Sequence, residues 1–430
     1  MPLKTLLFLI FLTLGCALSI FVNPFYGVVT YLVNYNISPA HQWWGRPLAQ
    51  MGLQFSKIAA LALALGILFH RDKIYTRRIF SSQEWLMLIF VLWIWITHFL
   101  GLPPGPYTTQ NAEKMTKIFI FLVMFSHVVF SLKRYEQVLW VLIILGLYQG
   151  VMAFLAPPWA FHGGRLNVGV GGPDFREGNF LGAHFAMLLP FIGVFFLLNK
   201  SWLKRIFLII TAIFVVNAIV LIRSRGVFLA TAMGAFMALI YCFQYMKKYR
   251  LQVFGLITFG ILGMLYLTDP GFWARMSTMK TENPEQIDLS AKGRLLAWKA
   301  SLKMVKDYPL GIGEGNFRSY VERYNPLIPG KDTHNTYLRC LAELGIPGFL
   351  LLLSLIINAF CFLRKSWILS HKRNLFKFQF YAFGLSISII IFLVSSMFIT
   401  ETYIEEFYFL LFLPLTLYYA LENELQARNK

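Results

Sequence analysis

Long apolar runs alternate with short polar connections along most of the chain. The runs fall near residues 4–22, 51–69, 84–101, 115–132, 137–156, 179–198, 206–222, 227–246, 252–268, 345–363, 378–400 and 407–421. A helix needs about 20 apolar residues to cross the roughly 30 Å hydrocarbon core of a bilayer. The pattern therefore predicts an all-α, polytopic membrane protein with about twelve transmembrane helices.

One connection is much longer and more polar than the others. Residues 1–267 hold the first nine predicted helices, residues 268–344 form the long loop, and residues 345–430 hold the last three helices and a tail. Within the loop, Leu295, Trp298 and Leu302 recur at helical spacing, and lysines occupy another face of the same segment. Such a segment is typical of an amphipathic helix that lies at the membrane interface.

Lysine and arginine side chains orient the predicted helices. One alternating set of short connections and chain ends carries twenty of them, and the short loops on the other side carry six. Because basic residues are enriched in cytoplasmic loops, the first side is predicted to be cytoplasmic. Both termini then lie in the cytoplasm and the number of spans is even. The long loop falls on the periplasmic side, since long loops escape the charge rule.

Composition narrows the functional classes. Hydrophobic residues make up 57% of the 430 and charged residues only 14%, a balance typical of a protein surrounded by lipid. The net charge of +19 is divided among short clusters between apolar runs, so membrane lipids and not nucleic acid are the expected partners. The four cysteines have no CxxC spacing, and we expect neither a metal site nor a cofactor.

Four arginines stand apart from the clusters that orient the helices. They lie beside predicted spans on the outer side: Arg165, Arg223, Arg225 and Arg294. A guanidinium binds phosphate oxygens in a bidentate manner, and several together can hold a pyrophosphate without a metal. A single outer arginine is also often only an anchor in the lipid headgroups.

The sharpest local motif is DTHNTYLRCLAELGIPG, which begins at Asp332. Thr333 is predicted to cap a helix that ends at Gly345, with Pro347 starting the next span. His334 would then occupy the first turn, where the helix dipole keeps an imidazole neutral, as a general base requires. Asp332 could fix its tautomer through a hydrogen bond. The alternative is a structural histidine.

Two other polar motifs receive structural interpretations. GIGEGNF, at residues 311–317, is predicted to form a tight turn after Pro309 and not a phosphate-binding loop, because it follows no strand. Three acidic residues before the last span, Glu401, Glu405 and Glu406, are expected to be solvated by water.

Several segments resemble the O-antigen ligase and O-antigen polymerase superfamily. HNTYLRCLAELGIPG is similar to its His-Asn, Leu, Glu-x-Gly signature, and GRLLAWKASLKMVKDYPLGIGEGNF is similar to the start of its large periplasmic loop. RLNVGVGGPDFREGNFLGAHFAMLLP agrees through Arg165, Gly169, Asn179 and Pro190, and so does SRG at residues 224–226. Together these motifs cover about a third of the chain.

The resemblance implies glycosyl transfer at the periplasmic face of the inner membrane of a Gram-negative bacterium. In this superfamily a glycan leaves undecaprenyl pyrophosphate and joins an acceptor hydroxyl. Ligases use the lipid A-core of lipopolysaccharide as acceptor, polymerases use a second lipid-linked glycan, and related enzymes use proteins. NPFYGVVTYLVNYNISPAHQWWG also resembles a subgroup of O-glycosylation ligases. We favour an O-antigen ligase and keep the other acceptors open.

These observations converge on a metal-independent, inverting transfer. The hypothesis assigns the pyrophosphate to Arg225 and Arg294, helper roles to Arg165 and Arg223, the catalytic base to His334, and supporting roles to Asp332 and Asn335. The main alternative is a transporter of lipid-linked sugars, which would place charged residues inside the spans. The predicted spans carry almost none, which favours the enzyme.

Overall fold

A computed structural model describes residues 3–50, 52–167, 170, 172–175, 177–277 and 289–429 of the protein. Gly169 and residues 278–288 of the predicted long loop lie outside this part. The α-helices are α1 (Leu3–Phe21), α2 (Phe25–Ile37), α3 (Arg46–Gln50), α4 (Phe55–Phe69), α5 (Ser82–Leu100), α6 (Ala112–Val128), α7 (Leu132–Phe154), α8 (Gly178–Leu198), α9 (Trp202–Ile222), α10 (Arg225–Tyr245), α11 (Arg250–Leu267), α12 (Pro270–Ser277), α13 (Leu289–Asp307), α14 (Phe317–Tyr324), α15 (Thr336–Lys372), α16 (Phe376–Ser395) and α17 (Glu405–Asn429). The shorter elements are the 3-10 helices η1 (Pro39–His41), η2 (Trp43–Gly45), η3 (Arg71–Lys73), η4 (Pro158–Ala160), η5 (Pro173–Phe175) and η6 (Lys247–Tyr249), and the paired strands β1 (Phe161–His162) and β2 (Arg165–Leu166).

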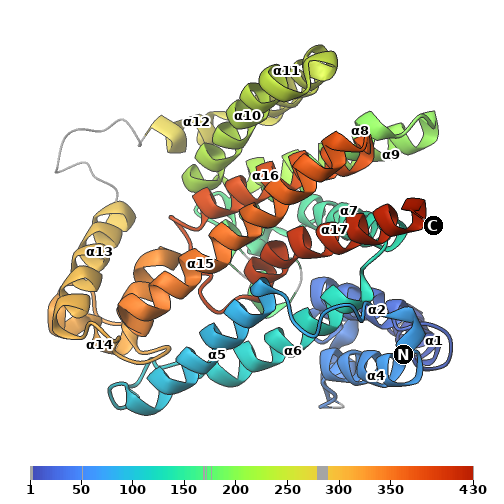
Figure 1. The fold of residues 1–430 in the computed structure, drawn as a ribbon. Helices are drawn as coiled ribbons and strands as arrows, with labels where there is room; N and C mark the ends of the chain where they lie inside the picture. The colour runs from blue at the N-terminus through green and yellow to red at the C-terminus, as the bar shows by residue number, and fades with distance from the viewer. Residues whose placement is uncertain are drawn as a thin grey trace.

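The helices form one bundle, with α12, α13 and α14 gathered at one end of it (Figure 1). Each predicted apolar run overlaps a helix of this bundle. In the described part of the chain, nine helices are long and apolar enough to cross a membrane, and α4 is a shorter apolar helix. The all-α, polytopic fold predicted from the apolar pattern is confirmed.

The two ends of the bundle differ, and the N-terminus lies at the end opposite to the predicted one. We call the end that carries α13 and the loop 396–404 the site end. The opposite end carries the basic clusters that the sequence predicts to be cytoplasmic, and we call it the basic end. The Lys73 ammonium donates to the Val22 carbonyl over 2.7 Å, so α1 finishes at the basic end. Its other end lies near η2, where the Thr5 hydroxyl donates to the Trp44 carbonyl over 2.5 Å. The prediction that both termini share one side is therefore wrong, because α2 adds a pass that the apolar pattern did not include.

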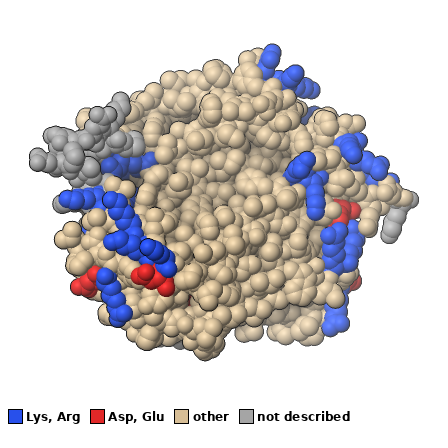
Figure 2. All heavy atoms as spheres, turned by 60° about the vertical axis from the view of Figure 1, so that its left-hand side comes forward, with Lys and Arg blue, Asp and Glu red and all other residues tan. Residues whose placement is uncertain are grey.

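The surface has the charge distribution of a membrane protein. Figure 2 shows lysine and arginine side chains in groups on opposite sides of this face, with a broad belt free of charged side chains between them. Large apolar side chains are exposed on the outermost helices, among them Phe254, Phe259 and Leu262 of α11. An uncharged, apolar belt of this kind matches the hydrocarbon core of a bilayer. The protein is a multi-pass membrane protein.

A break in α15 joins the bundle to the loop 309–317. Gly345 adopts φ 66°, ψ −171° inside α15, a conformation that ends the first helical segment. The carbonyls of Ala342 and Glu343, which the break frees, accept the amides of Ile312 and Gly313, each over 3.0 Å. The predicted helix end at Gly345 and the predicted turn in residues 311–317 are both confirmed.

The helix α13 packs on α15 through its small residues. Ala297, Ala300 and Met304 are buried in a satellite core together with residues of α14, whereas Leu295 and Leu302 are 48% and 56% exposed. Of the three apolar positions predicted for one face, Leu295 and Leu302 thus face outward, whereas Trp298 is partly buried. The inward face was not evident from the sequence, because alanine carries little hydrophobic signal.

The three acidic residues before α17 are buried, which contradicts the expectation that water solvates them. Glu401 accepts a hydrogen bond from Ser396, Glu405 accepts one from the Tyr31 hydroxyl, and Glu406 contacts the His184 ring. Burial raises the pKa of Glu401 well above its usual range. Ser396 is the C-cap of α16, just before this segment, whereas the partners of Glu405 and Glu406 come from the distant helices α2 and α8, which the sequence motif does not contain.

Candidate active site

A short hairpin at the site end positions Arg165. The strands β1 and β2 pair through a turn at Gly163 and Gly164, whose φ angles of 57° and 71° favour glycine. Arg165 Nε donates to the Ile222 carbonyl over 3.1 Å, and Arg165 Nη2 donates to Asn179 Oδ1 over 2.9 Å. The hairpin thereby fixes the guanidinium between the start of α8 and the end of α9.

Four arginines converge around this point. The pKa of Arg165 is lowered to about 10 by burial and by the positive charges of Arg275, Arg294 and Arg225. Arg225 is the first residue of α10, Arg275 lies on α12, and Arg294 lies on α13. Cations that lower one another's pKa repel each other. Such a site favours an anion of high charge, because the anion relieves this repulsion.

Arg223 has a different environment from this cluster. It ends α9 in the left-handed conformation, with φ 50°. Its guanidinium forms an ion pair with Asp269 and lies against Gly164 and Gly271. Arg223 therefore ties the turn between α9 and α10 to the segment that carries α12. Arg225, at the start of α10 in the same turn, is among the charges that depress the pKa of Arg165.

His334 lies before the helix and not in its first turn, which corrects the predicted capping. Asn335 is the N-cap of α15: its side chain accepts the amide of Leu338 over 3.0 Å. The Thr333 hydroxyl instead closes the turn, accepting the Asn335 amide over 3.2 Å. His334 occupies the turn with φ 45°, a conformation that costs free energy for a residue with a Cβ.

Glu177, and not Asp332, is the carboxylate closest to the His334 ring. His334 Nδ1 lies 3.6 Å from Glu177 Oε1, and the two side chains are 39% and 43% exposed. Glu177 also accepts a hydrogen bond from Asn179 over 3.1 Å, and Asn179 holds Arg165. One chain of contacts therefore links the histidine to the arginine cluster.

Asp332 is committed to other partners. Asp332 Oδ2 accepts Arg339 Nη1 over 2.8 Å, and Asp332 Oδ1 accepts the Thr333 amide over 2.7 Å and the Thr400 hydroxyl over 3.2 Å. Burial tends to raise the pKa of Asp332, but the charges of Arg339 and His334 and the hydrogen bonds from Thr333 and Thr400 together outweigh it, and the pKa is lowered from its usual value. The carboxylate stays ionised and holds the turn that carries His334. Its predicted hydrogen bond to the His334 ring is absent from the described contacts.

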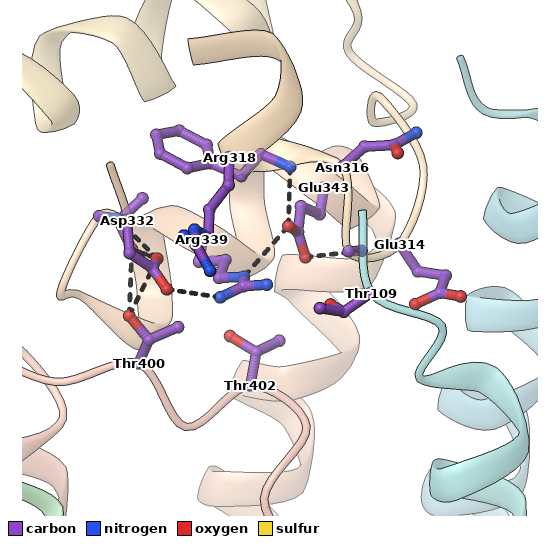
Figure 3. Close-up of polar contacts among 12 residues, drawn as sticks. Thr109, Glu314, Asn316, Arg318, Asp332, Arg339, Glu343, Thr400 and Thr402 are labelled. Carbon is purple, nitrogen blue, oxygen red and sulfur yellow. Dashed lines mark hydrogen bonds and ion pairs between the residues drawn. The ribbon is translucent and has the colours of Figure 1, made fainter. Parts of the chain in front are cut away.

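Arg339 continues this network into the bundle (Figure 3). Arg339 Nε donates to Glu343 Oε1 over 3.1 Å, so one guanidinium joins Asp332 to Glu343. The Glu343 carboxylate is fully buried and also accepts the amides of Gly315 and Phe317 over 3.0 and 2.9 Å. A charged carboxylate with so many donors is a strong anchor. It fixes the loop 309–317 against α15, beneath the turn of His334.

A cleft opens beside His334. Its volume is about 480 Å³, and Arg294 and His334 are both among its lining residues. On its other side the indole of Trp298 donates to the Thr333 carbonyl over 3.0 Å, so α13 braces the turn that carries the histidine. The cleft places His334, the candidate base, near Arg294 of the arginine cluster. One bound substrate can therefore contact both side chains.

Sequence reasoning missed two members of this arrangement. Arg275 lies in the long loop among many other basic residues, and only the fold separates it from them. Glu177 is 157 positions from His334, a separation that no local motif can span. Within the described residues, no group of three histidine, cysteine, aspartate or glutamate side chains is arranged to hold a metal ion.

Comparison with known proteins adds one result. Residues 210–353 match a family model described as O-antigen ligase. No match was found among curated proteins. The matched segment contains Arg223, Arg225, Arg275, Arg294 and His334, so it covers most of the site and extends through the break in α15.

Proposed function

We propose, from the premise that the chain belongs to the O-antigen ligase and polymerase family, that it is a ligase of the bacterial inner membrane. The family performs glycosyl transfer of the ligase or polymerase type. In our proposal the donor is a glycan on undecaprenyl pyrophosphate, and the acceptor is a hydroxyl of the lipid A-core at the periplasmic face. The single observation that carries the proposal is the convergence of Arg165, Arg225, Arg275 and Arg294 beside a cleft lined by His334.

The arginine cluster would bind the pyrophosphate of the donor. A diphosphate bound to sugar is a good leaving group once its charge is neutralised, and fixed guanidinium groups supply that neutralisation. Removing one such preorganised donor typically costs about 10² to 10³ in rate. Arg225 and Arg294 are the main candidates, Arg165 and Arg275 support them, and Arg223 positions the turn through Asp269.

His334 would activate the acceptor. Its ring accepts the proton of the acceptor hydroxyl as the oxygen attacks the anomeric carbon of the donor. The bond from that carbon to the phosphate oxygen breaks, and its electron pair leaves with undecaprenyl pyrophosphate. Glu177, 3.6 Å from His334 Nδ1, stabilises the imidazolium that forms. Direct displacement of this kind inverts the anomeric centre.

Purified protein with a defined donor tests the proposal. The donor is mixed with rough lipopolysaccharide, with a second lipid-linked glycan or with an unglycosylated protein acceptor, in the presence of a chelator and without nucleotide. We expect only the lipopolysaccharide to gain the glycan. Growth of the lipid-linked glycan instead would identify a polymerase, and an absolute need for a divalent ion would refute the arginine-based mechanism.

Single substitutions test whether the site residues act in the reaction or only support folding. Arg294→Ala and His334→Ala should abolish transfer while the protein still purifies as a single species in detergent. Lys303→Ala is the matched control, because Lys303 is an exposed cation of α13 that does not line the cleft. Wild-type transfer by both site variants would remove this site from the reaction.

A further inference from the structure

The wall of the cleft opposite the arginine cluster carries two additional cations. Arg318, on α14, and Lys331, in the turn before Asp332, line the cleft together with Arg294 and His334. The cleft volume of about 480 Å³ lies in the range of roughly 300–1,000 Å³ usual for small-molecule sites. It can therefore hold a saccharide unit and a charged substituent.

Arg318 is held in place at one edge of its guanidinium, and the other edge keeps hydrogen-bond donors for a ligand. Its Nε donates to the Gly330 carbonyl over 2.9 Å, and its guanidinium lies 5.4 Å from the centre of the Tyr107 ring. Its two terminal amino groups make no hydrogen bond to any residue that the structure describes. A guanidinium fixed at one edge and free at the other is preorganised for an oxyanion ligand.

Lys331 adds a second positive charge at the rim. A Cβ atom built on Gly293 would lie only 3.0 Å from Lys331 Nζ, so the ammonium rests against the glycine that precedes Arg294. Among the described residues that line the cleft, Asp332 is the only carboxylate, and it is already paired with Arg339. The cleft is therefore cationic on both sides of His334.

We propose that this cleft is the acceptor subsite and that it selects an anionic saccharide, with a phosphate or carboxylate near the accepting hydroxyl. The inference rests on the proposed function. A base must contact the hydroxyl that it deprotonates, so the ligand that fills the space beside His334 is the acceptor. Arg318 and Lys331 line that space, whereas Arg165, Arg225 and Arg275, which we assign to the donor side, are not among its lining residues.

The test compares two acceptors that differ in charge. Full-length protein is assayed with undecaprenyl-pyrophosphate glycan and rough lipopolysaccharide, either native or with its core phosphates removed. We expect the wild type to prefer the native acceptor. Lys331→Gln should raise the KM for the native acceptor about tenfold, the usual scale for one charge-assisted contact to phosphate, with donor KM unchanged.

Matched variants make the result specific. Lys331→Arg should restore the native KM, and Arg318→Gln should act like Lys331→Gln. Lys303→Gln, on the exposed face of α13, should change nothing. With the dephosphorylated acceptor, Lys331→Gln should behave like the wild type, because the contact it removes is absent there.

Three results would overturn the inference. Equal use of both acceptors by the wild type would show that the cleft does not select charge. An equal loss on both acceptors in Lys331→Gln would assign the residue a structural role, and a rise in donor KM would assign both cations to the donor. In each case transfer by the wild type continues and the proposed function stands, whereas absence of transfer to any acceptor would refute that function itself.

Discussion

The buried carboxylate of Glu343 offers the sharpest test of how the site is held together. Glu343 Oε1 accepts Phe317 N and Arg339 Nε, and Glu343 Oε2 accepts Gly315 N and the Tyr403 hydroxyl, all between 2.8 and 3.1 Å. In Glu343→Gln one oxygen becomes an amino group. Whichever way the amide turns, that group faces at least one N–H donor, because the Tyr403 hydroxyl can accept but Phe317 N, Arg339 Nε and Gly315 N cannot. At least one hydrogen bond and the negative charge opposite Arg339 are therefore lost.

The expected cost follows from these contacts. A hydrogen bond to a charged group contributes about 1.5–3 kcal/mol, which is the minimum loss. Breaking a buried ion pair by removing one charged partner costs about 3–5 kcal/mol, and this larger figure sets the scale. We therefore expect the substitution to lower the free energy of opening the loop 309–317 by about 4 kcal/mol.

Hydrogen–deuterium exchange measures this opening directly. A loss of about 4 kcal/mol corresponds to exchange about a thousandfold faster, because each 1.36 kcal/mol is a factor of ten. The effect should appear in peptides that cover Gly315 and Phe317. Glu136→Gln is the control: Glu136 is 25% exposed, pairs with Lys377 at the basic end, and should leave these peptides unchanged.

Glycosyl transfer activity should fall together with the protection of Gly315 and Phe317 from hydrogen exchange. Arg339 loses its charged partner in Glu343→Gln and keeps an ion pair only with Asp332, so the turn of His334 loosens. Unchanged exchange of Gly315 and Phe317 would refute the reasoning. It would mean that Glu343 is neutral in the folded protein, in which case an amide replaces it at little cost.

Three further predictions concern the charges around the substrate. Because the pKa of Arg165 is lowered to about 10, this residue loses its proton and its charge as the pH rises through 10, so kcat/KM for the donor should fall there; the pH profile of Arg165→Gln should lack that decline. Glu177→Gln should lower kcat about tenfold at unchanged donor KM, less than the roughly 10²–10⁴-fold usual for a direct acid or base, because Glu177 acts through His334; an unchanged kcat would exclude Glu177 from the reaction. Arg225→Ala should lose at least about a hundredfold in transfer rate, whereas Arg223→Ala, which loses only its partly exposed pair with Asp269, should keep most of it; the reverse order would exchange their roles.

The apolar pattern located the membrane helices well, because length and hydrophobicity are local properties. The missed helix α2 shows where that signal ends. Its thirteen residues contain Asn34 and Asn36, which are buried, with their amide groups donating to Ser56 and to the Leu32 carbonyl. Polar groups whose donors find acceptors inside a bundle lower the hydropathy of a pass without excluding it. That one omission reversed the side predicted for the N-terminus.

The candidate site was predictable in its residue types but not in its pairings. The outer arginines and His334 stood out because charged groups are rare beside membrane spans. The partner of His334 was assigned to the adjacent Asp332, whereas the fold brings Glu177 to the ring and commits Asp332 to Arg339. The N-cap moved from Thr333 to Asn335 for a similar reason, since both residues can cap and tertiary contacts of the turn decide between them.

The arginine cluster also bears on how a catalytic cycle would finish. Under the proposed reaction, the lipid that departs keeps both phosphates and gains a negative charge when it loses the glycan. Guanidinium groups that attract the donor would hold this spent carrier at least as firmly. Turnover would then be governed by escape of the carrier into the bilayer, and its accumulation would inhibit the enzyme in competition with fresh donor.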